Sequence, residues 1–250
     1  MPFTFCHPAI ILPLNKFGEK RISLTGLVIG SIVPDFEYFI RMSVYSKYSH
    51  TVSGVFYFDL PLALLLTFIF HYSLRTKLII NLPQMIRSRW ENCRDFKWMP
   101  YVKHHWIVVI YSILLGTCSH LLWDSFTHSG GYFVSKIQLL QGNIFLFGHP
   151  LPGYKIAQHL SSFAGFIIIA GAVYSMPAEK VSKRKGRWRY WFFIFLCAGL
   201  IVLFRMSAGG GWSLGNLTVS AIAAILLSMV IIPSIPFAHE NSVIRDQEEY

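Results

Sequence analysis

Charged residues are scarce in this chain of 250 residues. They make up 14% of the sequence, against about 25% in ordinary soluble proteins. Hydrophobic residues make up 54% of it, which is more apolar surface than a soluble globule of this size can bury. The composition argues against a disordered chain and against a soluble enzyme. It predicts an integral membrane protein.

The sequence also has little cysteine and few recognisable catalytic motifs. Its four cysteines are scattered, without the spacing of a zinc knuckle or a redox pair. A Gly-x-Ser-x-Gly elbow is missing, so a serine hydrolase has no support. The run Gly209–Gly211 lacks the strand and the Lys-Ser/Thr of a phosphate-binding loop. Residues 1–15 lack the basic leader of a cleavable signal peptide, so we expect insertion to depend on the membrane spans themselves.

Long apolar runs, in contrast, are abundant. A bilayer core of roughly 30 Å needs about 20 mostly apolar helical residues. The stretches that meet this requirement are Val55–Ser73, Trp106–Trp123, Leu160–Met176, Tyr190–Met206, Leu217–Ile235 and, with two acidic residues near its end, Ile22–Ile40. The shorter run Pro8–Leu14 is predicted to be re-entrant or interfacial. We therefore predict an all-α, polytopic membrane helix bundle of about six transmembrane helices with a short N-terminal segment.

The basic residues predict an orientation. The net charge is +10, and 17 of the 22 Lys and Arg residues fall on one side of a six-span model, mainly in Arg75–Lys103 and Lys180–Arg189. These loops are predicted to be cytoplasmic, because basic loops stay on that side of the membrane. Anionic lipid is the expected partner of such loops, and nucleic acid is not.

The densest polar cluster lies in the run Ser119–His128. His120, Asp124 and His128 are four residues apart, so on a helix they share one face. Two such neighbours can hold one metal ion, as in helical zinc sites, and a third can bind a second ion or orient a ligand. The alternative interpretation is a helix end whose polar side chains meet water and headgroups.

Further ionisable residues are predicted at the same, outer side. Asp35 and Glu37 lie near the end of a span, where an unpaired carboxylate is costly and marks a functional candidate. An interfacial pair with Arg41 is the alternative. Three histidines also fall on this side, each of which alone is more often structural than a ligand: His50, His149 and His159.

Several motifs resemble one bacterial membrane family, called domain of unknown function 4184. The motifs are Met1–Pro8, Gly30–Tyr38, Phe58–Pro61, Ser119–His128 and Leu151–His159. The resemblance implies a membrane domain over residues 1–165 that carries the His/Asp cluster. C-terminal transmembrane helices would follow in residues 166–239, and a polar tail in residues 240–250.

The sequence is also similar to the predicted inner-membrane metal-dependent hydrolases. These share an N-terminal histidine, a Pro-Asp-x-acid segment, a histidine ahead of a span and a later His-x-x-x-Asp helix. The matching positions here are His7, Asp35 with Glu37, His50, and His120 with Asp124. Glu37 replaces the usual aspartate, and the shortened stretch around His50 removes one candidate ligand of a two-metal site.

Three hypotheses follow. The first is a membrane-embedded metal-dependent hydrolase acting on a lipid or lipid-linked phosphoester, with Zn²⁺ as the expected ion and Mn²⁺ or Fe²⁺ as alternatives. Glu37 or His128 would be its general base. The expected ligands are His7, Asp35, His120 and Asp124, with His50, His128 and His159 as additional ligands or as residues that orient the ligands. The second hypothesis is a proton or cation relay or transporter, and the third is a non-catalytic scaffold or assembly protein with a structural metal.

Overall fold

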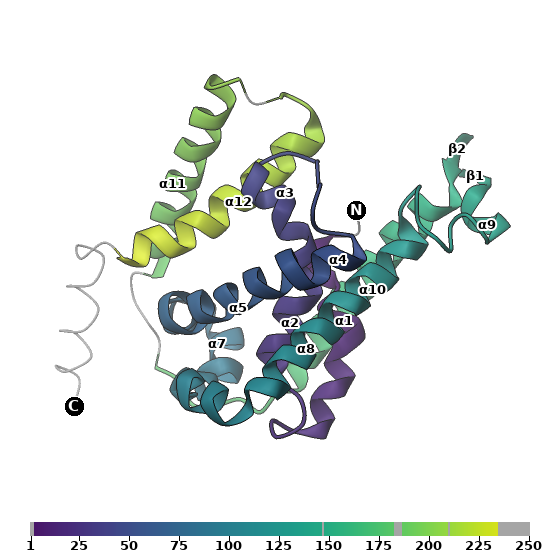
Figure 1. Ribbon diagram of the computed structural model, residues 1–250. Coiled ribbons are helices and arrows are strands. Elements are labelled where there is room, and N and C mark those ends of the chain that lie inside the picture. Colours follow the sequence, from purple (N-terminus) through teal and green to yellow (C-terminus); the bar gives the residue numbers. More distant parts are fainter. Residues whose placement is uncertain (1–2, 147, 183–186, 210, 235–250) are drawn as a thin grey trace. The chain divides into compact units, whose positions relative to one another are not determined.

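The computed structural model describes residues 3–146, 148–182, 187–209 and 211–234, and it is almost entirely helical (Figure 1). The predicted tail 240–250, Gly210 and residues 183–186 of the basic run lie outside this part of the chain. The helices are α1 (Pro8–Ile11), α2 (Leu24–Ile32), α3 (Phe36–Arg41), α4 (Val52–Gly54), α5 (Leu60–Ile69), α6 (Arg75–Asn81), α7 (Gln84–Trp90), α8 (Trp98–Thr127), α9 (Gln138–Gln141), α10 (Gly153–Ser175), α11 (Arg187–Ser207) and α12 (Leu214–Ile231).

In the described part of the chain, five helices are long and apolar enough to cross a membrane. They are Val52–Asn81, Trp98–Thr127, Gly153–Ser175, Arg187–Ser207 and Leu214–Ile231. The first comprises α4, α5 and α6, joined through two π-helical turns, η4 (Val55–Asp59) and η5 (Phe70–Leu74). The prediction of a helical membrane bundle is confirmed, and the chain is a membrane protein.

The predicted sixth span, Ile22–Ile40, is not among these five helices. Its residues form the nine-residue helix α2, the 3-10 turn η3 (Val33–Asp35) and the six-residue helix α3. Pro34 lies within η3 and has no N–H group with which to continue the hydrogen bonding of α2. A helix as short as α2 extends only about 14 Å. The helix therefore changes to a 3-10 turn within this segment, and whether the segment crosses the membrane stays a prediction.

The N-terminal segment is short, as predicted. Residues Pro8–Leu14 form α1 and the first part of the 3-10 turn η2 (Leu12–Phe17). Helix α1 packs against α2 and α10, and Ile11 is buried beside Leu27 of α2. Whether this segment is re-entrant or interfacial stays a prediction.

Helices α2 and α8 cross closely because one glycine of each helix lies against the backbone of the other helix. A Cβ atom on Gly30 would lie 2.2 Å from the carbonyl oxygen of Ile113, and one on Gly116 would lie 2.3 Å from that of Leu27. Small residues allow such close crossings in membrane proteins. The hydroxyl of Thr117 also donates a hydrogen bond to the carbonyl of Gly30, at 3.2 Å. The crossing fixes the C-terminal half of α8 against the end of α2.

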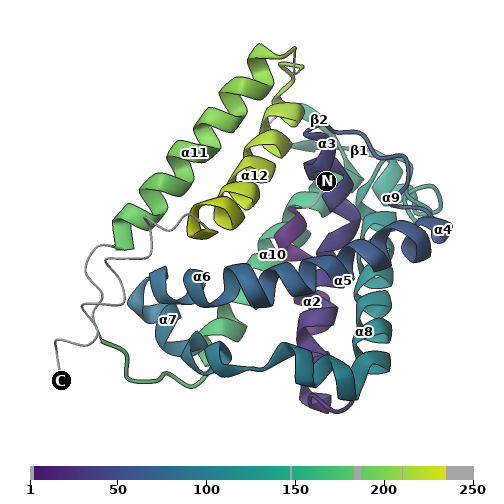
Figure 2. The same cartoon turned by 60° about the vertical axis from the view of Figure 1, so that its left-hand side comes forward.

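The chain forms two compact units. The first comprises Met1–Phe36, Lys47–Thr67 and Met99–Ser175, and it contains the α2–α8 crossing described above. The second comprises Glu37–Ser46, Phe68–Trp98 and Met176–Tyr250. Within the second unit, α11 packs along α12 (Figure 2). The predicted division of the chain at residue 165 stays a prediction.

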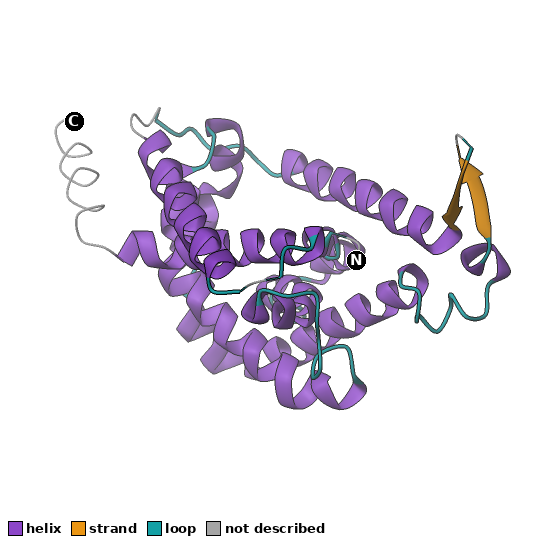
Figure 3. Cartoon of the chain, turned by 90° about the horizontal axis from the view of Figure 1, so that it is seen from above, coloured by secondary structure: helices purple, strands orange, loops and turns teal. Residues whose placement is uncertain are grey.

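A β-hairpin lies between α8 and α10, in the first unit. Strands β1 (Asn143–Leu146) and β2 (His149–Pro152) pair antiparallel, with Ile144 opposite Leu151 (Figure 3). The short helix α9 precedes the hairpin. It packs directly against the first turn of α10. The approach is so close that a Cβ atom on Gly153 would lie 1.9 Å from the carbonyl oxygen of Leu139. The hairpin and α9 are thereby attached directly to the start of α10.

Candidate metal centre

Four ionisable side chains converge in the first unit. They are Asp35 in η3, His50 just before α4, and His120 and Asp124 near the end of α8. One ligand atom from each lies within 4.8 Å of the other three. Asp35 and His120 are fully buried, Asp124 is buried, and His50 is half-buried. Two buried carboxylates this close repel each other, so a cation between them is favoured.

The distances between these atoms resemble those in a metal-binding site. Nε2 of His120 lies 3.3 Å from Oδ2 of Asp124 and 3.7 Å from Oδ1 of Asp35. Nε2 of His50 lies 3.4 Å and 3.6 Å from the same two oxygens. Four ligands placed about 2.0–2.1 Å from a tetrahedral zinc ion are about 3.3 Å apart. The spacing therefore fits a single divalent ion.

Two of these atoms are buried without a hydrogen bond in the described part of the chain. They are Oδ1 of Asp35 and Nε2 of His120. Buried polar atoms of this kind are rare and need an explanation. Coordination of a metal ion would satisfy both atoms. The donor set contains nitrogen and oxygen but no thiolate, which suits Zn²⁺, Mn²⁺ or Fe²⁺.

The His120 ring is held by the crossing of α2 and α8. Its Nδ1 lies 2.8 Å from the carbonyl oxygen of Ser31. A proton on Nδ1 donates to this carbonyl and leaves the lone pair of Nε2 directed at the two carboxylates. This arrangement is common for metal-binding histidines. The sequence spacing that predicted His120 and Asp124 on one helix face is consistent with their side-by-side position on α8.

His50 is oriented by a tight turn. Its backbone is in the left-handed region, with φ of 61°, which is uncommon for residues other than glycine and is often found at functional sites. Its Nδ1 lies 2.9 Å from the hydroxyl of Ser49, which leaves Nε2 toward the cluster. The hydroxyl of Thr51 closes the turn by donating a hydrogen bond to the carbonyl of Tyr48 at 2.9 Å, and it caps α4 by accepting one from the N–H of Gly54 at 3.0 Å.

The electrostatics at His50 favour positive charge. Burial opposes protonation of the ring, but the neighbouring carboxylates of Asp124 and Asp35 outweigh burial and raise the pKa of His50 to about 9. The carboxylates therefore draw a cation to this point of the cluster.

Thr4 and His7 of the N-terminal segment contact the carboxylates of Asp35 and Asp124. The hydroxyl of Thr4 donates a short hydrogen bond of 2.5 Å to Oδ2 of Asp35. Nε2 of His7 lies 3.3 Å from Oδ1 of Asp124, and the His7 ring stacks on His120 at 3.9 Å between centroids. His7 was predicted as a metal ligand. It contacts Oδ1 of Asp124, whereas His50 and His120 face Oδ2 of the same carboxylate. Thr4 and Ser31 were not predicted. Ser31 acts through its backbone carbonyl, so its side chain gave no signal.

The remaining predicted residues have other surroundings. His128 follows the end of α8, where its Nδ1 lies 3.2 Å from the carbonyl oxygen of Asp124 and 3.4 Å from its carboxylate. Burial lowers the pKa of His128. Glu37 accepts hydrogen bonds from Arg41 at 2.8 and 2.9 Å, the pairing that was the alternative interpretation. His159 is exposed on α10, and His149 is exposed in β2.

A comparison with known protein families identifies the family of this chain. The family model described as domain of unknown function (DUF4184) matches residues 1–234. The chain belongs to this family. The match extends beyond the motifs in residues 1–165 and covers all five of the membrane-crossing helices. No curated protein and no solved structure matches the chain.

The contacts of Thr4 and His7 predict how strongly the N-terminal segment supports metal binding. Thr4→Val or His7→Ala removes a partner of a carboxylate but none of the four converging ligand atoms. We expect the affinity for Zn²⁺ to fall by about 10–100-fold without being abolished. Competition with a chromophoric chelator measures this. Thr218→Val is the matched control, because the Thr218 hydroxyl donates to the carbonyl of Leu214 on its own helix, far in sequence from the four converging ligands. Equal affinities for the Thr4, His7 and Thr218 variants would contradict the prediction.

Proposed function

We propose that this protein is a membrane-embedded, metal-dependent hydrolase acting on a lipid or lipid-linked phosphoester. One observation carries the proposal, the convergence of ligand atoms from Asp35, His50, His120 and Asp124 at metal-ligand spacing. A divalent ion held by these residues would act as a Lewis acid toward a phosphoryl oxygen and make water more acidic. Zn²⁺ is the ion that the proposal favours, with Mn²⁺ and Fe²⁺ as alternatives.

His128 is the residue best suited to act as general base. A proton on its Nδ1 is held by the backbone carbonyl of Asp124. Its Nε2 is then unprotonated, and this atom is buried without a hydrogen bond in the described part of the chain. Such a nitrogen can accept the proton of an attacking water molecule. Glu37 was the other candidate, but its carboxylate is engaged by Arg41, so we assign the role to His128.

The choice of substrate rests on the position of the cluster in the helices. His50 immediately precedes the spanning helix Val52–Asn81, and Asp124 lies in the last turn of Trp98–Thr127. The first helix leads away from the cluster and the second leads back to it, so in the predicted topology the cluster lies at the same membrane boundary for both helices. A phosphoester in a lipid headgroup lies at that level. We place the protein in the bacterial inner membrane, with the basic loops cytoplasmic and the cluster toward the outer face.

The proposal predicts a variant that keeps the metal ion but loses turnover. We expect His128→Gln to retain the ion and to lower kcat by about 10²–10⁴-fold. Purified protein in detergent is loaded with Zn²⁺ or Mn²⁺ and assayed with p-nitrophenyl phosphate and with phosphatidic acid. The matched control is His149→Gln, since this histidine is exposed in the hairpin. Metal-loaded protein without turnover on either ester would contradict the phosphoester proposal, and an unchanged kcat in His128→Gln would contradict the role of His128.

The number of ligands supports a second candidate function, a scaffold with a structural metal. Structural zinc sites are closed by four protein ligands, whereas catalytic zinc sites have three and keep one position open. Four residues converge here. The two candidates differ in whether a coordination position is accessible. Inorganic phosphate added to Co²⁺-substituted protein should change the visible spectrum if the site is catalytic and leave it unchanged if the site is closed.

A further inference from the structure

The segment between α8 and α10 exposes large apolar side chains although it lies outside the spanning helices. Leu139 of α9 is 69% exposed, and Leu146 of β1 and Leu151 of β2 are also exposed. Residues 129–152 contain a single charged residue, Lys136. A loop in water normally carries polar and charged residues, and a contiguous apolar patch marks an interaction surface.

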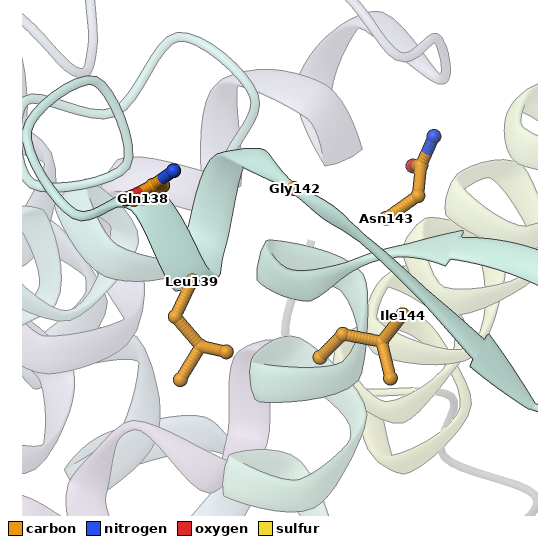
Figure 4. A pocket seen from close by; sticks show the side chains of 5 residues that line it. All are labelled: Gln138, Leu139, Gly142, Asn143 and Ile144. Atoms are coloured by element: carbon orange, nitrogen blue, oxygen red, sulfur yellow. The ribbon is translucent and has the colours of Figure 1, made fainter.

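These side chains form one face. Side chains alternate between the two sides of a strand, so Ile144 and Leu146 point to the same side, and Leu151 joins them because it pairs with Ile144. Leu139 of α9 and Ile144 line a common open hollow. Figure 4 shows their side chains pointing to the same side, with Asn143 directed away from it. We call Leu139, Ile144, Leu146 and Leu151 the aliphatic face. His149 lies on the same side, because it pairs with Leu146, and the opposite side of β1 carries Asn143 and Phe145, which is 73% exposed.

The ends of the segment fix where this face can lie. Helix α8 ends at Thr127 and α10 begins at Gly153, and both are among the spanning helices. Because consecutive spans cross in opposite directions, both ends of the hairpin segment lie on the same side of the membrane in the predicted topology. Helix α10 continues from the hairpin with exposed apolar side chains, including Leu160 and Phe163, which are suited to face lipid. The aliphatic face is thus followed along the chain by a helix whose exposed side chains are suited to contact lipid.

We infer that the hairpin and α9 lie on the bilayer surface, with the aliphatic face inserted among the lipid chains at the headgroup boundary. The partner is the lipid bilayer itself. Apolar side chains of interfacial segments penetrate about 5–10 Å into this boundary. The lack of acidic residues in the segment removes repulsion by anionic headgroups, and its one charged residue, Lys136, is attracted by them. The inference does not depend on whether the protein is a hydrolase.

Spin labels on the two sides of the segment test this orientation. The four natural cysteines are replaced, and single cysteines are introduced by Leu146→Cys and, on the opposite side of the same strand, Asn143→Cys. A second pair, Leu139→Cys and Gln141→Cys, repeats the comparison on α9, where two residues are about 200° apart. The labelled full chain is placed in nanodiscs of phosphatidylethanolamine and phosphatidylglycerol. Accessibility to oxygen and to a water-soluble nickel chelate then reports depth.

We expect the labels at Leu146 and Leu139 to be reached by oxygen in preference to nickel, at a depth of about 5–10 Å. The labels at Asn143 and Gln141 should show the reverse. Preferential nickel accessibility at all four positions would overturn the inference, because the hairpin would then extend into water. Protection of the Leu146 and Leu139 labels from both reagents would also overturn it and would indicate a protein contact, such as a second copy of the chain. Having two pairs on different elements protects the test against a single variant that misfolds.

Discussion

Replacing His120 by alanine is expected to remove the metal ion from the protein. The His120 side chain is fully buried, and its Nε2 lies 3.3 and 3.7 Å from the carboxylates of Asp124 and Asp35. Without the ring, two buried carboxylates and His50 remain at a site with a cavity in place of one ligand. Elemental mass spectrometry of protein purified in detergent should find about one ion per native chain and only background in His120→Ala.

His159→Ala is the control that makes this result specific. His159 was also predicted as a ligand, but it is exposed on α10 and is not one of the four converging residues. We expect this variant to hold as much metal as the native chain. Loss of metal in His159→Ala would show that the ion lies elsewhere. Native protein that stays metal-free after incubation with Zn²⁺ and Mn²⁺ would contradict the metal centre and, with it, the proposed hydrolase.

The part of this site that lies on one helix could be predicted from sequence spacing alone. His120 and Asp124 are four residues apart, and helical geometry places them side by side without any knowledge of the fold. Asp35 and His50 are 85 and 70 residues distant from His120, so their approach depends on tertiary packing. The sequence placed them only at the same end of the bundle, and their assignment as ligands rested on the family resemblance.

The contacts that orient the ligands were beyond prediction for a different reason. Ser31 acts through its backbone carbonyl, and every residue has such a group. Thr4 is an ordinary threonine whose role depends on the path of the N-terminal segment. The 3-10 turn within the predicted span Ile22–Ile40 could not be predicted from hydropathy, because hydropathy averages over a window, whereas Pro34 acts at one position.

Replacing Gly30 by alanine is expected to destabilise the protein and to weaken metal binding together. The new Cβ atom would lie 2.2 Å from the carbonyl oxygen of Ile113, and a backbone oxygen cannot move aside as a flexible side chain can. Helices α2 and α8 must therefore separate. Overpacking of this kind costs about 1–3 kcal/mol. Separation would also lengthen the 2.8 Å contact between Nδ1 of His120 and the carbonyl of Ser31, and loss of such a contact lowers metal affinity by about 10–100-fold.

Gly171→Ala on α10 separates this effect from the general effect of losing a glycine. A Cβ atom at Gly171 would meet no atom within 4 Å, and alanine has the higher helix propensity. We therefore expect its Tm in detergent to equal or exceed that of the native chain, with full metal content. Gly116→Ala should behave like Gly30→Ala, since its Cβ would lie 2.3 Å from the carbonyl oxygen of Leu27. If both variants at the crossing kept the native Tm and the native affinity for Zn²⁺, the close approach of α2 and α8 would not be what holds His120 in place. A lower Tm with unchanged affinity would assign the crossing to stability alone.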